Sequence, residues 1–384
     1  MGLFEKVFGD RTEKKQEYVK AINEFKLLTP YQPVFTSWNG AIYESALVRA
    51  AINAKAVHVS KLRVQISGPA QQKLQTKLKR APNPWQTWSQ FLYRCSTILD
   101  VQNTLFVVPI LNEAQETTGI YPILPSRAEF KDYKGRPWVQ FKIRDRTAVC
   151  ELSRIGILCK FQYSHDFIGE RNTALAETMK LIDLQNKGIA EAVSAGASHR
   201  FFARLTNFAK AEDLAKERER FDKENMSEGG GLLLFPNTYD SIHQVEPQNY
   251  VVDSKQMELI EKNIFDYFGV NEDVLQNKAY GDKWNAFYES AVEPFAIQFS
   301  EVLTRMLFTE KEQGNNEVIC TANRLQYMSN SEKLDVSSQL TDRGILNRDE
   351  AREIWNLPPL PNGEGQKFLI RAEYKGVEEQ TNEN

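Results

Sequence analysis

Apolar residues recur at every third or fourth position in several segments of this chain, which is the spacing of an amphipathic helix. Proline at position 294 falls inside one of these segments and should kink the helix, because it cannot donate the usual backbone hydrogen bond. Glycine at position 269 suits the C-terminal end of another. The spacing predicts helices over residues 43–62, from Thr87 to Ile98, and over residues 173–202, 257–267 and 286–310.

Residues 209–227 predict a helix of a different kind, because charged residues of both signs lie side by side along it. Pairs of opposite charge four residues apart would stabilise such a helix in solvent. Three glycines, Gly229–Gly231, end it, and the apolar run Leu232–Phe235 predicts a short strand. The polar stretch 270–284 has no apolar period and is expected to be an irregular loop.

The region from Thr104 to Phe141 has the β-rich composition of a small sheet. Its strands are expected at residues 105–111, 118–125 and 138–143, with turn residues such as Gly119 and Gly135 around them. Helices and strands therefore occur in separate parts of the chain, and the predicted fold class is α+β.

A short helix with a clear beginning and end is predicted inside the segment 343–365. Asn347 can cap its N-terminus, and Glu350 can reach back to complete a capping box. Pro358 and Pro359 stop the helix near Asn356. No side chain in this segment is a plausible catalyst, so its role is structural.

Composition narrows the possible functions. The chain has 384 residues, of which 41% are hydrophobic and 26% charged, with a net charge of -3. A protein that reads duplex DNA usually has a strongly basic face, so tight base-specific binding is not expected. Four cysteines without metal-ligand spacing are expected to be reduced and mostly buried. No segment approaches the roughly 18 apolar residues that span a bilayer.

Sequence motifs give no positive sign of catalysis. The chain contains no phosphate-binding P-loop, nucleophile elbow or zinc-binding HExxH motif, and Gly229–Gly231 precedes a predicted strand instead of a helix. His165 and Asp166 could serve in acid–base chemistry, but a polar surface turn explains them better. The N-terminus lacks a signal-peptide core. It is expected to form an amphipathic arm that docks on a partner through Leu3, Phe4, Val7 and Phe8.

Several motifs occur in the order found in one known family. An alanine-rich helix from Ser45 comes first, then a "PNPxxTxxxF" element, a "P-x-x-P" phrase that ends the β-region, and a helix ending in "FGV". The segment 343–365 comes last. Together they resemble the portal proteins of long-tailed bacteriophages over residues 40–372. The residues that carry the middle motifs are Pro82, Asn83, Pro84, Thr87, Phe91, Pro122, Pro125, Asp253, Gln256, Ile264, Phe268, Gly269 and Val270.

The resemblance implies a portal-type subunit with an α/β wing, a helical stem, a small α/β clip and a helical crown. The wing would occupy residues 1–172 and, as a helix and a strand, 286–335. The two stem helices would span 173–200 and 249–269 on either side of a clip at 201–248. A tunnel loop would follow at 270–285, and the crown with a polar tail at 336–384.

The resemblance also implies a ring, usually dodecameric, at one capsid vertex, through which double-stranded DNA is packaged and ejected. In the tunnel loop, polar side chains would face the channel and touch phosphates transiently, with the two lysines as weak brakes. These residues are Asn271, Gln276, Asn277, Lys278, Tyr280 and Lys283. In the clip, the basic residues of the charged helix would dock the packaging ATPase, terminase, and later the head-completion proteins. These are Lys216, Arg218, Arg220 and Lys223.

Other implied partners are the major capsid and scaffolding proteins, with the virion as final location and the host cytoplasm during assembly. DNA contact would be independent of base sequence, and no membrane, cofactor, metal ion or enzymatic activity is predicted. Alternatives remain open: a capsid or scaffold component without a DNA channel, or a hydrolase with a dispersed site. Without the resemblance, the loop would be an ordinary solvent loop and the charged helix a solvated face.

Overall fold

The computed structural model describes thirteen parts of the chain, which form two compact units. One unit combines residues 1–176 with 261–384, and the other spans 177–260. We call them the body and the insert and describe each by itself. The described residues are 26–31, 37–38, 40–41, 45–112, 117–143, 146–196, 200–205, 211–221, 223, 239–245, 254–322, 330–355 and 357–371. The predicted N-terminal arm and Gly229–Gly231 lie outside them.

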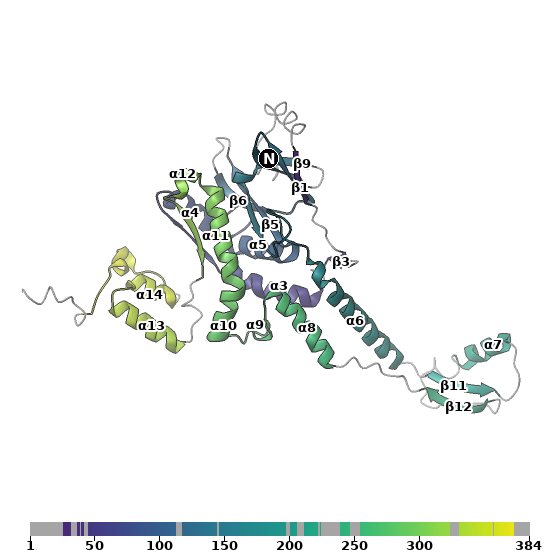
Figure 1. Ribbon diagram of the computed structural model, residues 1–384. Coiled ribbons are helices and arrows are strands. Elements are labelled where there is room, and N and C mark those ends of the chain that lie inside the picture. Colours follow the sequence, from purple (N-terminus) through teal and green to yellow (C-terminus); the bar gives the residue numbers. More distant parts are fainter. Residues whose placement is uncertain are drawn as a thin grey trace, which may run out of the picture. The chain divides into compact units, whose positions relative to one another are not determined.

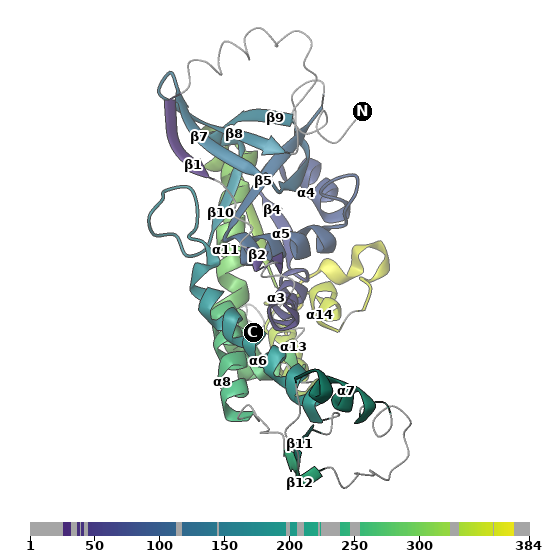
Figure 2. The ribbon, with the colours of Figure 1, turned by 90° about the vertical axis from the view of Figure 1, so that its right-hand side faces the viewer.

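Two antiparallel sheets pack together in the body (Figure 2). The first has the order β1-β7-β8-β9 and the second the order β10-β5-β6. Their core contains Phe106, Phe130 and Phe141, and the rings of Phe106 and Phe141 lie 5.1 Å apart. The strands are β1 (Lys26–Tyr31), β5 (Thr104–Leu111), β6 (Thr117–Ile123), β7 (Arg127–Tyr133), β8 (Arg136–Ile143), β9 (Arg146–Glu151) and β10 (Gly156–Cys159).

The predicted β-region is therefore confirmed and extended. The strand expected at 138–143 belongs to β8, where Val139 and Phe141 are fully buried and alternate with half-exposed neighbours. This alternation is what one buried face of a sheet requires. Four further strands of these sheets, β1, β7, β9 and β10, were not predicted. The apolar period is weakened in β7 by its four charged residues and in β10 by its length of four residues.

A helical layer completes the body (Figure 1). Phe91 of one helix and Phe299 of another bring their rings within 6.1 Å, and both side chains are fully buried. Beside them, the antiparallel strands β4 (Arg63–Ser67) and β13 (Glu317–Thr321) form a separate two-stranded sheet. The helices of this layer are α3 (Ala46–Val59), α4 (Gln71–Arg80), α5 (Trp88–Gln102) and α11 (Glu293–Leu307).

The "PNPxxT" motif fastens α5 to the second sheet. Thr87 caps the helix, and Gln90 closes a capping box with it. Asn83 donates from Nδ2 to the Ile120 carbonyl at 3.2 Å, and the Ile120 amide donates to the Pro82 carbonyl at 2.7 Å. The motif thus ties the beginning of α5 to β6, which is a structural role.

Hydroxyl groups of α11 accept hydrogen bonds from backbone amides at the edge of β13 that does not pair with β4. The Val318 amide donates to Thr304 Oγ1 at 2.9 Å, and the Cys320 amide donates to Ser300 Oγ at 2.8 Å. Unpaired strand edges are otherwise available to foreign strands. The helix therefore both packs on the strand and closes it.

The helix predicted at 286–310 is present over residues 282–307, with a π-helical turn just before Pro294. It begins as α10 (Asp282–Phe287), passes through a π-helical turn at Tyr288–Val292 and continues as α11. Proline cannot donate to the carbonyl four residues earlier, and its ring crowds that carbonyl. The wider π turn just before Pro294 accommodates both effects.

The C-terminal segment contains the predicted capped helix. Helix α14 (Arg348–Ile354) follows α13 (Asn330–Asp342). The Glu350 amide donates to Asn347 Oδ1 and the Asn347 amide donates to Glu350 Oε2, both at 2.9 Å, which confirms the capping box. The Leu360 amide donates to Asp349 Oδ1 at 2.8 Å, so the chain after the prolines folds back onto the helix start.

The insert contains two antiparallel strands and the helix between them. These are β11 (Arg200–Leu205), α7 (Ala211–Phe221) and β12 (Tyr239–Val245), and they follow helix α6 (Ala176–Gly196). The helix predicted over 173–202 was too long, because residues 200–202 pair with β12. The strand predicted at Leu232–Phe235 lies outside the described residues. The chain returns to the body within α8 (Ser254–Phe268), and Gly269 follows it with a φ of 71°, as predicted.

All four cysteines are free, as expected, and Cys95 and Cys320 are buried. Burial disfavours the thiolate and raises the pKa of Cys320 to about 12. The predicted polar turn at His165 and Asp166 is confirmed, since both side chains are exposed.

Candidate functional site

The loop between α8 and α10 is the first candidate site. Its structure differs from the irregular loop predicted over 270–284. Residues Glu272–Leu275 form a helical turn, α9, and residues 282–284 already belong to α10. Asn271 caps α9, because its Oδ1 accepts from the Val274 amide at 3.0 Å. The polar composition concealed this short helix, since four residues cannot show an apolar period.

Asp273 holds the loop closed. Its carbonyl accepts from the amides of Lys278 at 2.7 Å and Ala279 at 3.1 Å. Its carboxylate accepts from Lys283 Nζ at 2.7 Å across the loop. Sequence reasoning missed Asp273. The available signal was an acidic residue within the first turn of a helix capped by Asn271.

The six residues predicted to face a channel are all exposed, but they are not equivalent. The structure brings Lys278 to Gln276, with Nζ donating to Oε1 at 2.6 Å. Gln276 in turn donates to Glu272, and Lys283 is paired with Asp273. Tyr280 has 76% of its surface exposed. Asn277 has a φ of 57° at the turn.

Helix α9 and the π-helical turn that follows α10 contact α3 (Figure 1). Val274 and Trp284 are almost fully buried, and the Trp284 ring stacks on Tyr288 at 5.2 Å. His58 of α3 packs edge-on against Phe287 at 5.2 Å. Burial, with a smaller effect from the charge of Lys61, lowers the pKa of His58 to about 4. Buried residues at both ends therefore fix the loop to the body.

Charge within the loop is nearly balanced. Three acidic residues, Glu272, Asp273 and Asp282, oppose two lysines, Lys278 and Lys283. Lys283 is held by the Asp273 carboxylate, whereas Lys278 is exposed and donates to the Gln276 side-chain oxygen. Such a loop offers few positive charges to a phosphate backbone, and tight binding to DNA depends on such charges.

The basic residues of α7 are the second candidate site. Lys216, Arg218, Arg220 and Lys223 are all exposed. Side chains three or four residues apart share a helix face, whereas those two apart do not. Lys216 and Arg220 therefore lie on one face of α7 and Arg218 on another. Lys223 lies two residues beyond the end of the helix.

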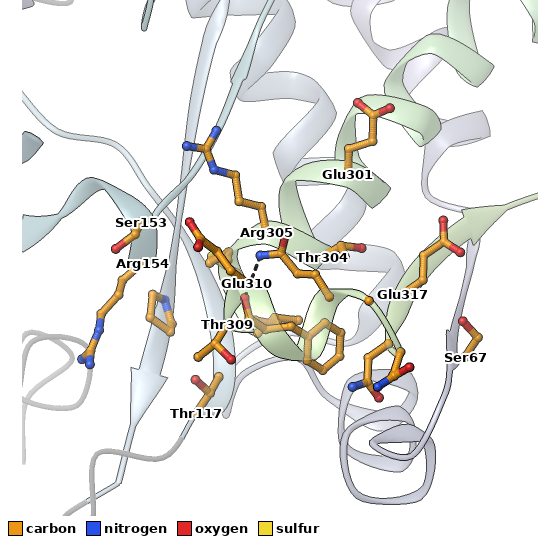
Figure 3. Close-up of a pocket in the computed structure, with 18 of the residues that line it drawn as sticks. Ser67, Thr117, Ser153, Arg154, Glu301, Thr304, Arg305, Thr309, Glu310 and Glu317 are labelled. Carbon is orange, nitrogen blue, oxygen red and sulfur yellow. Dashed lines mark hydrogen bonds between the residues drawn. The ribbon is translucent and has the colours of Figure 1, made fainter.

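The body also has a groove of about 1040 Å³ at the C-terminal end of α11 (Figure 3). Arg154 and Arg305 line it together with Glu301, Glu310 and Glu317. Its remaining lining comes from hydroxyl, amide and apolar side chains, without histidine or cysteine among the described residues. The groove thus combines both signs of charge and shows no arrangement of a nucleophile with a base.

Within the described parts of the chain, no cluster of histidine, cysteine, aspartate or glutamate could hold a metal ion. The helices there are also too short or too polar for any of them to cross a bilayer.

Comparison with known proteins places these features in a family. The model of the family described as "Phage portal protein" matches residues 46–356. A search of curated protein sequences found no match.

Several solved structures share the fold at low sequence identity. The neck of the empty GTA (gene transfer agent) particle, computed with C6 symmetry, has a TM-score of 0.58 and 14% identity. The alignment covers 86% of this chain and 96% of that one. The neck of the native GTA particle, computed with C12 symmetry, has a TM-score of 0.56 and 13% identity, with coverage of 89% and 99%.

An HK97 family phage portal protein from Corynebacterium diphtheriae has a TM-score of 0.51 and 13% identity, with coverage of 75% and 95%. The family match extends from α3 in the body, through the whole insert, to the end of α14. It includes the "PNPxxT" element, the capped loop and the capped C-terminal helix. The chain therefore belongs to the phage portal protein family.

Proposed function

We propose that twelve copies of this chain assemble into a ring that forms the portal at one capsid vertex. Double-stranded DNA would enter during packaging and leave during ejection through the axial hole. The observation that carries the proposal is the continuous family match over residues 46–356, which spans both compact units. The fold shared with a GTA neck computed with C12 symmetry supports twelve copies.

A closed ring repeats one heterologous interface around an axis, so every copy presents the same loop and the same insert. In the proposed arrangement the wing comprises residues 1–172 and 286–335, and α6 and α8 lie in the two stem segments. The strands β11 and β12 with α7 belong to the clip, residues 270–285 form the tunnel loop, and α13 and α14 lie in the crown.

The charge of the loop favours a channel through which DNA slides, in preference to a site that holds DNA in place. Every phosphate that a protein neutralises strengthens binding, and strong binding would oppose sliding. The loop carries one more acidic than basic residue, and the whole chain has a net charge of -3. In this proposal Lys278 touches passing phosphates, while Lys283 shapes the loop through Asp273.

The exposed basic residues of α7 are proposed as the docking surface for terminase and, later, for head-completion proteins. Charge on an accessible helix steers association and selects partners. Capsid and scaffolding proteins would contact other parts of the ring. Assembly would take place in the host cytoplasm and end in the virion, and hydrolysis of nucleotide would be left to terminase.

Electron microscopy of the purified full-length protein tests the proposal most directly. We expect rings with a central hole, and class averages with twelvefold symmetry. Shells or sheets would contradict a portal and favour a coat or scaffold protein. The proposal would also be overturned if the protein stayed monomeric at all concentrations and labelled heads did not carry it at one vertex.

A further inference from the structure

A buried polar network lies where the chain leaves the body and where it returns. Asn172 stands four residues before the exit at Ala176, and Tyr267 stands six residues after the return at Glu261. The Tyr267 hydroxyl donates to Asn172 Oδ1 at 2.6 Å. Both residues belong to the body, so this bond ties the outgoing segment to the incoming one within a single compact unit.

Every donor and acceptor position of the Asn172 side-chain amide has a hydrogen-bond partner. Its Nδ2 donates to the carbonyls of Asp100 at 3.2 Å and Val101 at 3.0 Å, in the last turn of α5. Its Oδ1 accepts from Asn103 Nδ2 at 2.6 Å and from the Tyr267 hydroxyl. Two donors and two lone pairs are all that an amide offers. The partners also fix its orientation, because a flipped amide would point NH₂ at two donors.

The end of α5 makes this amide rigid. Asn103 is fully buried and has a φ of 55°, and its Nδ2 also donates to the Glu170 carbonyl at 2.7 Å. Gly169 approaches so closely that a Cβ atom there would lie 2.3 Å from the Asn103 carbonyl oxygen. The neighbouring Asp100 carboxylate is buried and holds Lys55 at 3.0 Å. Asn172 is therefore a fixed point of the body.

Tyr267 connects this fixed point to the candidate loop. It is the penultimate residue of α8 and precedes the loop's cap, Asn271, by four positions. Its ring packs on Phe161 at 5.1 Å, and the buried Phe268 follows it. Apolar packing holds the helix end near the core but is not directional. A hydrogen bond to a rigid acceptor adds the direction that packing lacks.

We propose that the bond between Tyr267 and Asn172 is a positioning latch: it sets the angle at which α8 delivers the loop 271–283. Tyr267 is a positioning residue, since its effect on DNA would pass through the loop. The part of the proposal that concerns DNA rests on the portal function proposed above. The part that concerns the loop's order stands on the body's geometry alone.

Hydrogen exchange on the purified full-length protein, compared between wild type and Tyr267→Phe, tests the latch. The variant removes one hydroxyl and keeps the ring that packs on Phe161. The reporters are the amides of Gly269, Val270 and Lys278, which donate to the carbonyls of Asp266, Phe265 and Asp273. We expect exchange at these amides to rise roughly 2- to 10-fold, since one net hydrogen bond is lost.

Two comparisons make the result specific. Tyr163→Phe removes a hydroxyl from a tyrosine that is 92% exposed and should leave exchange in the loop unchanged. Amides of β5 should keep wild-type exchange in Tyr267→Phe, because a general loss of stability would raise exchange there too. Unchanged exchange at the three reporters, or an equal rise in β5, would overturn the latch. The measurement requires neither a ring nor DNA, so failure of the portal function would be seen separately, by microscopy.

Discussion

Lys283 Nζ and Asp273 Oδ2 lie 2.7 Å apart and join α9 to the first turn of α10. This ion pair separates the two lysines that sequence reasoning treated alike. Lys283 is engaged within the loop, whereas Lys278 contacts the amide of Gln276 and keeps its charge toward solvent. Exposed ion pairs contribute little stability, about 0–1 kcal/mol, so the pair shapes the loop more than it stabilises the fold.

Replacing these lysines should therefore have two different effects. In Lys278→Ala we expect filled heads to retain less DNA, because a transient phosphate contact is lost while the loop keeps its form. In Lys283→Ala we also expect less retained DNA, together with faster hydrogen exchange at the Lys278 and Ala279 amides. Retained genome length, measured from purified heads, gives the first readout. Wild-type retention in the double variant would exclude a channel role for both lysines.

Reversing charge on α7 tests the proposed docking surface. In Arg218→Glu combined with Arg220→Glu we expect terminase to associate about tenfold more slowly, because long-range attraction becomes repulsion. The two single variants separate the helix faces, since Arg220 shares its face with Lys216 and Arg218 does not. Binding kinetics at two salt concentrations provide the measurement. Terminase docking that is equally fast in the double variant would remove α7 from the interface.

Asn347→Ala should destabilise the C-terminal helix by about 1 kcal/mol, since the variant loses the cap of α14. We expect impaired ring assembly with normal packaging by those rings that do assemble. Asn347→Asp keeps an oxygen in the same position and should restore assembly. Assembly yield and packaging efficiency are measured separately. A packaging defect in fully assembled rings would instead make Asn347 part of a functional site.

His58 should make the stability of the body depend on pH. Its pKa is lowered from 6.5 to about 4, so the unfolded chain binds more protons than the folded protein between those values. Stability contributed by the neutral imidazole is therefore complete above pH 6.5 and is lost progressively toward pH 4. In His58→Gln we expect a flatter decrease of Tm across this range, measured by calorimetry. If Tm depended on pH equally in the two proteins, the protonation of His58 would not change on unfolding, and the prediction would be wrong.

Local patterns in the sequence were sufficient where the structure is local. The predicted cap formed by Asn347 and Glu350 needs only residues three positions apart. An irregularity of the helix near Pro294 follows from the chemistry of proline. That the irregularity is a π-helical turn does not follow from the sequence. The α+β fold class was also predicted from the sequence. The antiparallel pairing of β5 with β6 is the arrangement that consecutive strands with a short connection usually adopt.

Long-range contacts were decided by the tertiary structure. No local pattern pairs β4 with β13, which lie about 250 residues apart in sequence, or brings Tyr267 to Asn172. The helix predicted through residue 202 failed because pairing with β12 outweighed the apolar period at its end. The sequence by itself determined local features, such as the capped start of α14 and the glycine that follows α8, because these depend on residues a few positions apart. Only the folded body decided that Asp273 holds Lys283 and leaves Lys278 to solvent, because that choice depends on which side chains meet in space.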